Sequence, residues 1–139
     1  MVINFFAVLV CAVLSLVIGF IWYGPLFGKK WMAMMGADKL SEEQKKEKMK
    51  GMWKLYLTQF LLVLFQMYVL SWYIGTLSDI SSGVHTAFSV WIAFIIPTLA
   101  SASMWSGDSK KVAWSKFLIQ AGYNLVLFLI CGHILGVWM

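Results

Sequence analysis

Apolar residues along this chain of 139 residues gather into four long runs that are separated by shorter polar stretches. A run of about 20 apolar residues forms a helix that crosses the ~30 Å hydrocarbon core of a membrane. The runs extend over residues Val2 to Trp22, Leu55 to Gly75, Thr86 to Trp105 and Phe117 to Trp138. The pattern therefore predicts a single all-α transmembrane domain over residues 1–139, an integral membrane four-helix bundle.

Composition and charge support this interpretation and add an orientation. Hydrophobic residues make up 61% of the chain and charged residues only 12%, which does not suit the core and wet surface of a soluble domain. All eleven basic residues are lysines, eight between the first two runs and three between the last two. Because cytoplasmic loops hold the excess of positive charge, we expect both termini outside and a multi-pass protein of the cell's inner (plasma) membrane.

The net charge of +5 is a topology signal rather than a sign of nucleic-acid binding. The chain lacks arginine, whose planar fork favours bidentate capture of phosphate. We expect membrane lipids as partners, with the lysines of residues 45–54 near anionic headgroups, and no nucleic acid.

The polar connection between the first two runs predicts a cytoplasmic helix. Ser41 and Gln44 have the spacing of a capping box, and Glu42 and Lys46 are placed to form an i,i+4 pair. Gly51 is the helix breaker before the second run. We expect a helix that starts after Ser41 and continues into the second span with a kink at Gly51.

The segment from Trp22 to Trp31 is the most distinctive feature of the chain. Pro25 and its neighbouring glycines should end the first helix, while Trp22, Tyr23 and Trp31 anchor the chain at the water interface. One interpretation is a plain interfacial stop. The other is a short element, including Phe27, that folds back on the inner ends of the second and third spans and offers a contact surface to a partner.

Small residues recur at helical spacing and predict close helix packing. In the first run they form a row that we expect to be the tightest seam of the bundle, made of Ala7, Cys11, Ser15 and Gly19. Gly132 and Gly136 form a GxxxG pair in the fourth run, and residues 100–103 add small side chains in the third. The pattern leaves open whether these rows pack within one chain or between copies.

Uncharged polar residues inside the runs should meet in the interior, because an unpaired amide in hydrocarbon is costly. They are Gln59, Gln66, Gln120, Tyr123 and Asn124. Hydrogen bonds between helices are one role for them, and a solute path is the other. Pro97 should kink the third span.

Histidine and cysteine residues offer the other candidate chemistry. His85 and His133 are predicted at similar depth on sequential helices, where they could ligate haem, or a metal with Asp79. Cys11 and Cys131 are expected to be buried apolar thiols at different depths. The chain has no catalytic triad, Walker loop or HExxH motif, and no carboxylate within a run, so we expect it not to be an enzyme.

Several segments together resemble one known family. They are Ile3-Asn4, the segment Trp-Tyr-Gly-Pro-Leu-Phe-Gly-Lys-Lys-Trp ending at Trp31, Gln120-Ala121-Gly122-Tyr123-Asn124, and residues 132–138. They resemble a family of small four-span prokaryotic membrane proteins catalogued as a domain of unknown function. The resemblance extends over essentially the whole chain. It implies the four-span fold and brings no activity with it.

Three hypotheses about function follow. The first, which we favour from sequence, is a non-catalytic packing protein, either a homo-oligomer or an accessory subunit of a larger membrane complex. The second is a channel or carrier for a small solute, lined by Gln59, Gln66, Gln120 and Asn124. The third is a haem- or metal-binding module that uses His85 and His133.

Overall fold

A computed structural model describes residues 3–36, 39–78 and 82–138 of the chain. The described residues are almost entirely helical and contain no strand, which confirms the all-α prediction. The elements are α1 (Phe5–Ile21), the π-helical turn η1 (Trp22–Leu26), α2 (Gly28–Met34), α3 (Glu42–Met49), α4 (Met52–Thr76), α5 (Gly83–Val90), the π-helical turn η3 (Trp91–Ile95), α6 (Ile96–Met104) and α7 (Lys110–Val137).

Four continuous helical stretches are long and apolar enough to cross a membrane, as the hydrophobic runs predict. They are Phe5–Leu26, Met52–Thr76, Gly83–Met104 and Lys110–Val137. The last begins seven residues before the predicted Phe117, because the side chain of Ser109 accepts a hydrogen bond from the Val112 backbone N–H and caps a polar first turn.

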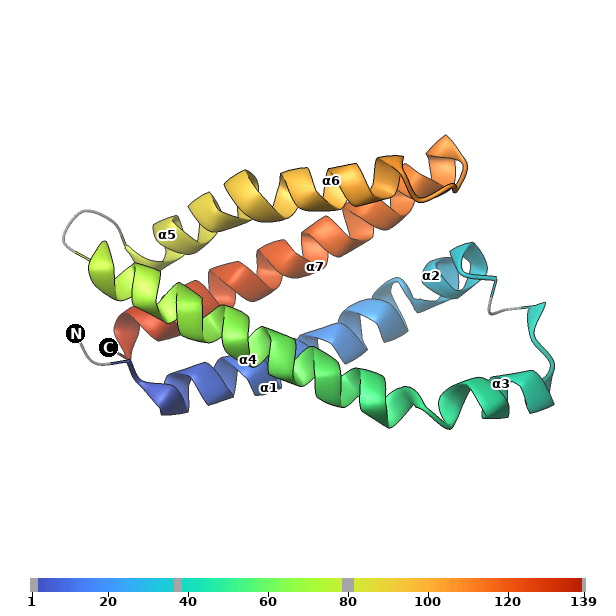
Figure 1. Cartoon of the computed structure of the whole chain (residues 1–139), viewed down its shortest axis with the longest axis horizontal. Coiled ribbons are helices and arrows are strands. Elements are labelled where there is room, and N and C mark those ends of the chain that lie inside the picture. The colour runs from blue at the N-terminus through green and yellow to red at the C-terminus, as the bar shows by residue number, and fades with distance from the viewer. Residues whose placement is uncertain (1–2, 37–38, 79–81, 139) are drawn as a thin grey trace.

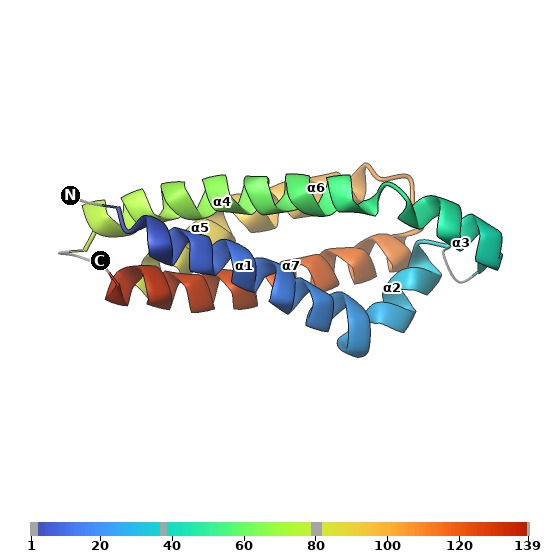
Figure 2. The same ribbon diagram turned by 90° about the horizontal axis from the view of Figure 1, so that it is seen from below.

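The four spans run antiparallel, and both chain ends lie at one end of the bundle (Figure 1). The opposite end holds α2, α3 and the connection from α6 to α7, so all eleven lysines gather there. We call it the lysine end. Figure 2 shows the same separation from below. Which side of a membrane the lysine end faces stays a prediction.

Helix α3, at the lysine end, begins at Glu42 as the capping pattern predicts. Ser41 Oγ accepts a bond from the Gln44 backbone N–H, and the Gln44 side chain accepts one from the Ser41 backbone N–H. The helix does not run on into the second span, however. It ends at Met49, and α4 starts after Gly51, so the expected kink is a full break.

Both prolines lie at π-helical turns. Pro25 was expected to end the first helix, yet the chain continues through it as η1 and leaves the helical path only at Phe27. Pro97 likewise follows η3 and lies at the start of α6. A proline ring clashes with the carbonyl four residues earlier, and the wider π turn makes room for that carbonyl within a continuous span.

Helix α7 is the centre of the bundle and packs against every other span. Its closest neighbour is α5, where Gly132 and Gly136 lie against Gly83 and Ala87. The tightest seam is therefore between α5 and α7, and not along α1 as predicted. Glycine at position 132 allows this close approach of the two helices, because a Cβ there would lie 2.6 Å from the Ala87 Cβ.

The small residues of α1 also pack inside the protomer. Ala7, Cys11 and Ser15 are buried, and Gly19 faces the ring of Tyr123 on α7. Both rows of small residues thus join helices of the same chain. At the other end of α1, Asn4 caps the helix and its Nδ2 donates to the Trp138 carbonyl oxygen at 2.7 Å, which ties the start of the first span to the end of the last.

Candidate functional site

The segment Ile119 to Asn124 of α7 is where the other spans converge. Trp22 Nε1 donates a hydrogen bond to the Ile119 carbonyl oxygen at 2.9 Å, and Trp91 Nε1 donates to the Ala121 carbonyl oxygen at 3.0 Å. A helix carbonyl has a second lone pair for such a bond. Two indoles from different spans therefore hold α7 from two sides.

The remaining residues of this segment complete the contact. A Cβ on Gly122 would lie 2.9 Å from Trp22 Cζ2, so glycine leaves the space that the indole fills. The Tyr123 hydroxyl donates to the Ser15 carbonyl oxygen at 2.8 Å. These contacts give a structural reason for Gly122 and Tyr123 in the Gln-Ala-Gly-Tyr-Asn motif.

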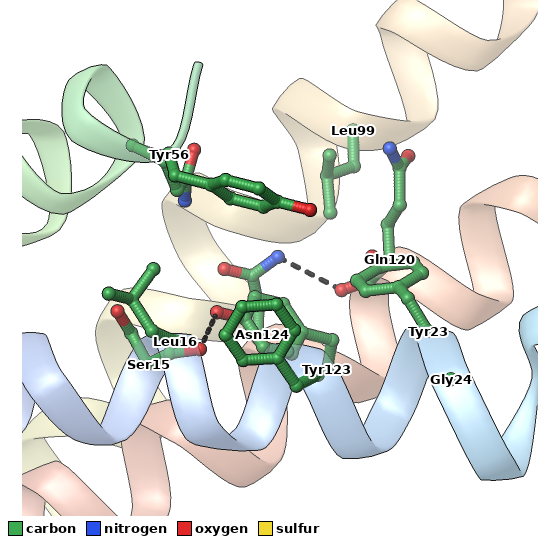
Figure 3. Close-up of a pocket in the computed structure, with 12 residues that line it drawn as sticks. Ser15, Leu16, Tyr23, Gly24, Tyr56, Leu99, Gln120, Tyr123 and Asn124 are labelled. Atoms are coloured by element: carbon green, nitrogen blue, oxygen red, sulfur yellow. Dashed lines mark hydrogen bonds between the residues drawn. The ribbon is translucent and has the colours of Figure 1, made fainter. Parts of the chain in front are cut away.

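Next to this junction lies a cavity of about 460 Å³, which we call the central cavity. Its volume is within the range of small-molecule sites, roughly 300–1,000 Å³. All four spans contribute to its lining, and Figure 3 shows their side chains around one space. The lining residues are Ser15, Leu16, Gly19, Phe20, Tyr23, Gly24, Tyr56, Gln59, Leu99, Gln120, Tyr123 and Asn124.

Four of the five predicted polar residues meet in this cavity: Gln59, Gln120, Tyr123 and Asn124. Asn124 Nδ2 donates to the Gln120 carbonyl oxygen at 2.9 Å, one turn earlier on the same helix. That bond orients the amide and leaves its Oδ1 facing the cavity as an acceptor (Figure 3).

Most of the polar groups in the central cavity keep their hydrogen-bonding capacity. Within the described part of the chain, the amides of Gln59 and Gln120 and the hydroxyls of Tyr23 and Tyr56 have no hydrogen-bond partner. Every lining side chain is also of an uncharged type. The cavity therefore offers donors and acceptors but no counter-charge.

A second hollow of about 240 Å³ adjoins the central cavity toward the lysine end, and we call it the inner pocket. Gln120 lines both. The inner pocket also contains Trp31, Lys116 and Asp108, and the lysine Nζ lies 2.9 Å from the Asp108 carboxylate. A partly buried ion pair thus lies between the central cavity and the lysine end of the molecule.

Gln66 does not join the other polar residues. It lines a separate hollow of about 190 Å³ among α4, α5, η3 and α7, mostly between apolar side chains such as Leu70 and Phe128. The expected solute path through all four amides is therefore wrong for Gln66. Seven residues separate it from Gln59, so both share a face of α4, but the distance along the helix is about 10 Å.

The histidine pair is not assembled either. Gly83 and Ala87 form the face of α5 that packs on α7, and His85 is about 200° round the helix from Gly83. Both imidazoles are exposed, and His133 lines a small hollow with Gly83. No group of three or more metal-ligating residues occurs among those the structure describes, and Asp79 lies outside them.

The Trp22 to Trp31 segment neither stops at the membrane exit nor turns back along the spans, because α2 continues beyond η1 at the lysine end (Figure 1). Its helix α2 contacts α7, the fourth span, and Trp31 shares the inner pocket with Ser103 at the end of the third span. The Tyr23 and Trp31 rings meet edge to face with centroids 4.8 Å apart, and the Trp22 and Phe27 rings lie 5.1 Å apart. Tyr23 therefore lines the central cavity and also contacts Trp31, which lines the inner pocket.

The two cysteines face each other across α1 and α7. The Cys11 Sγ lies 4.0 Å from the Cys131 carbonyl oxygen, and the Cys131 Sγ lies 3.9 Å from the Cys11 carbonyl oxygen. Both thiols are free and buried, as predicted, but they lie at the same depth and not at different ones.

Sequence reasoning missed Tyr23, Tyr56 and Leu99 as cavity residues. Tyr23 was assigned to the membrane interface, and Tyr56 was not singled out. A signal for Tyr56 exists, because it lies three residues before Gln59 on the helix face that continues to the buried Val63. The sequence could not identify Leu99 as a cavity residue, because an apolar side chain in a span is equally suited to contact lipid or to line a cavity.

Fold and site together define a small helical bundle with four membrane-capable spans around an uncharged polar cavity. Over residues 6–136 the chain matches the family model described as "Protein of unknown function (DUF1761)", and it belongs to that family. The match confirms the family resemblance seen in the sequence. No curated protein and no solved structure matches the chain.

Proposed function

We propose that this protein is a non-catalytic membrane carrier that binds a small uncharged molecule in the central cavity. One observation carries the proposal: hydrogen-bonding side chains from three spans converge on one cavity without satisfying one another. An amide or hydroxyl left unpaired away from water costs about 1–3 kcal/mol. A bound molecule that pairs with several of these groups offsets that cost.

The surroundings of the cavity favour a carrier over an open channel. Toward the chain ends the bundle is closed by packed side chains, among them the fully buried Cys11, Leu127 and Cys131. Toward the lysine end the cavity adjoins the inner pocket. A solute that crosses would therefore need a rearrangement of the helices, for which the π turns at Pro25 and Pro97 offer hinge points.

Binding is tested with three uncharged probes: urea, glycerol and monolauroylglycerol. Thermal unfolding of the purified protein is followed with and without each probe, because a ligand that binds only the folded state raises its stability. Each probe is used at a concentration far below that at which urea denatures or glycerol acts as an osmolyte. The double variant Gln59→Leu with Gln120→Leu should lose the shift. The matched control Gln66→Leu, on the same helix face but outside the cavity, should keep it.

Transport is tested in proteoliposomes with the probe that binds. The same double variant should abolish flux, and Gln66→Leu should not. If none of the probes binds, or if the double variant binds and transports as well as the parent protein, the proposal is refuted.

The second candidate function is the homo-oligomer or accessory subunit expected from the sequence. The observation that favours it is a row of small residues on the third span that is exposed, unlike the row on α1: Ser89, Ala93, Pro97 and Ser101. Such a row lets another helix approach closely. The double variant Ala93→Leu with Ser101→Leu should then convert an oligomer into a monomer by native mass measurement. A parent protein that is monomeric in mild detergent and retains no partner would exclude this candidate.

We infer the orientation from the lysines: the lysine end faces the cytoplasm, both chain ends lie outside, and the membrane is the inner (plasma) membrane. The test is a cysteine at exposed Ser41, treated with a membrane-impermeant thiol reagent. Reaction in inside-out vesicles but not in intact cells supports the orientation, and the reverse result refutes it.

A further inference from the structure

The central cavity has an open side between the second and third spans. Helix α4 packs on α1, α5 and α7, whereas α6 packs on α7, and no extensive contact joins the described residues of α4 to those of α6. Tyr56 of α4 and Leu99 of α6 lie on one side of the cavity, opposite Ser15 and Tyr123 (Figure 3). Phe20 and Tyr56, with ring centroids 5.6 Å apart, cover the neighbouring seam between α1 and α4. The uncovered side therefore faces the lipid.

The depth of the cavity can be read from the helix rise of 1.5 Å per residue. Gln120 and Asn124 lie about 6 and 12 Å further along α7 than Lys116, and Gln59 lies about 8 Å beyond Lys54 on α4. Lysines of this kind hold their ammonium groups at the headgroups. The polar groups of the cavity are thus level with the first part of the lipid chains in the leaflet at the lysine end.

Access from water at the lysine end is more obstructed than access from lipid. The route through the inner pocket passes the Lys116–Asp108 ion pair and the Tyr23–Trp31 ring pair before it reaches Gln120. Among the described residues the side between α4 and α6 has no such ion pair, and its rim residues, Tyr56 and Leu99, are amphipathic and apolar. An occupant with an apolar part is accommodated at that rim.

We infer that the molecule bound in the central cavity is an amphiphile with an uncharged, hydrogen-bonding head and an apolar chain, which reaches the cavity sideways from the leaflet at the lysine end. The head pairs with Gln59, Gln120 and Asn124, and the chain leaves between Tyr56 and Leu99 into the lipid. A charged head is disfavoured because the lining has no counter-charge. The inference rests on the proposed function and names its class of ligand.

The experiment compares monolauroylglycerol with glycerol, which has the same head group without the chain. A cysteine placed at Leu99 is labelled with a maleimide while the native thiols are buried. Monolauroylglycerol should slow labelling severalfold and glycerol should not. The same slowing should disappear in a background of Gln59→Leu with Gln120→Leu and persist with Gln66→Leu.

A second variant tests the sideways route. Leu99→Trp narrows the opening and should abolish the thermal shift given by monolauroylglycerol, whereas Leu118→Trp, an exposed position of α7 away from the cavity, should leave it unchanged. If glycerol protects the cysteine and stabilises the protein as well as the amphiphile does, the inference is overturned while the proposed function stands. If neither of these two probes binds, the inference fails, and the proposed function fails with it only if urea does not bind either. An equal slowing in the Gln59/Gln120 background would show partition into lipid alone and would also overturn the inference.

Discussion

Replacing Gly132 by alanine tests the packing on which the whole bundle depends. The new Cβ would lie 2.6 Å from the Ala87 Cβ and 2.7 Å from the Gly83 carbonyl oxygen, whereas carbon atoms at rest are about 3.5–4.0 Å apart. Helices α5 and α7 must therefore separate by about 1 Å. Overpacking of this kind costs about 1–3 kcal/mol, and the better helix propensity of alanine offsets up to about 1 kcal/mol. We expect a net loss of about 1–2 kcal/mol in the free energy of unfolding.

The native cysteines supply the assay for this prediction. Cys11 and Cys131 are buried, so a fluorogenic thiol reagent reacts with them only as the bundle opens during heating. Gly51→Ala is the control, because a Cβ at that exposed position meets nothing within 4 Å. Adding Ala87→Gly to Gly132→Ala removes the 2.6 Å contact and should restore part of the lost stability. A Gly132→Ala protein that melts no lower than the parent would refute the close crossing of α5 and α7.

Three further predictions use the same assay or a local one. Trp22→Phe removes the bond to the Ile119 carbonyl and should lower the free energy of unfolding by about 0.5–1.5 kcal/mol; an unchanged melting curve would contradict that bond. Ser71→Ala should stabilise the protein by up to about 1 kcal/mol, because the buried Ser71 hydroxyl has no partner among the described residues, and a destabilised variant would show an unseen partner. Ser41→Ala should speed hydrogen exchange in α3, by a loss of about 1 kcal/mol in helix stability, without moving the melting temperature of the bundle; a lower melting temperature would mean that α3 supports the spans.

The sequence predicted what depends on the contrast between water and hydrocarbon. The four spans, the capping box at Ser41 and the gathering of the lysines at one end all follow from where polar residues interrupt apolar ones. Four of the polar residues line one cavity, although Gln59 is exposed and not in the interior as predicted.

The sequence could not predict which face of each span points inward. In a membrane, residues that face lipid and residues that face the protein core are both apolar, so the hydrophobic pattern does not show which face of a helix is buried. This is why the partnership of Gly83 and Ala87 with Gly132 was missed, and why Leu99 could not be assigned to the cavity. The π turn at Pro25 adds a local change of register that residue counting does not capture.

The bond between Asn4 and the Trp138 carbonyl oxygen suggests a way to change the order of the helices along the chain. Because Asn4 Nδ2 lies 2.7 Å from the Trp138 carbonyl oxygen, a short linker could join these two regions of the chain without moving a helix. The chain could then be reopened in the connection between α2 and α3 as a circular permutant. Such a protein would begin and end at the lysine end while keeping every lysine in place. Its insertion would separate the influence of charge placement from that of the order in which the helices leave the ribosome.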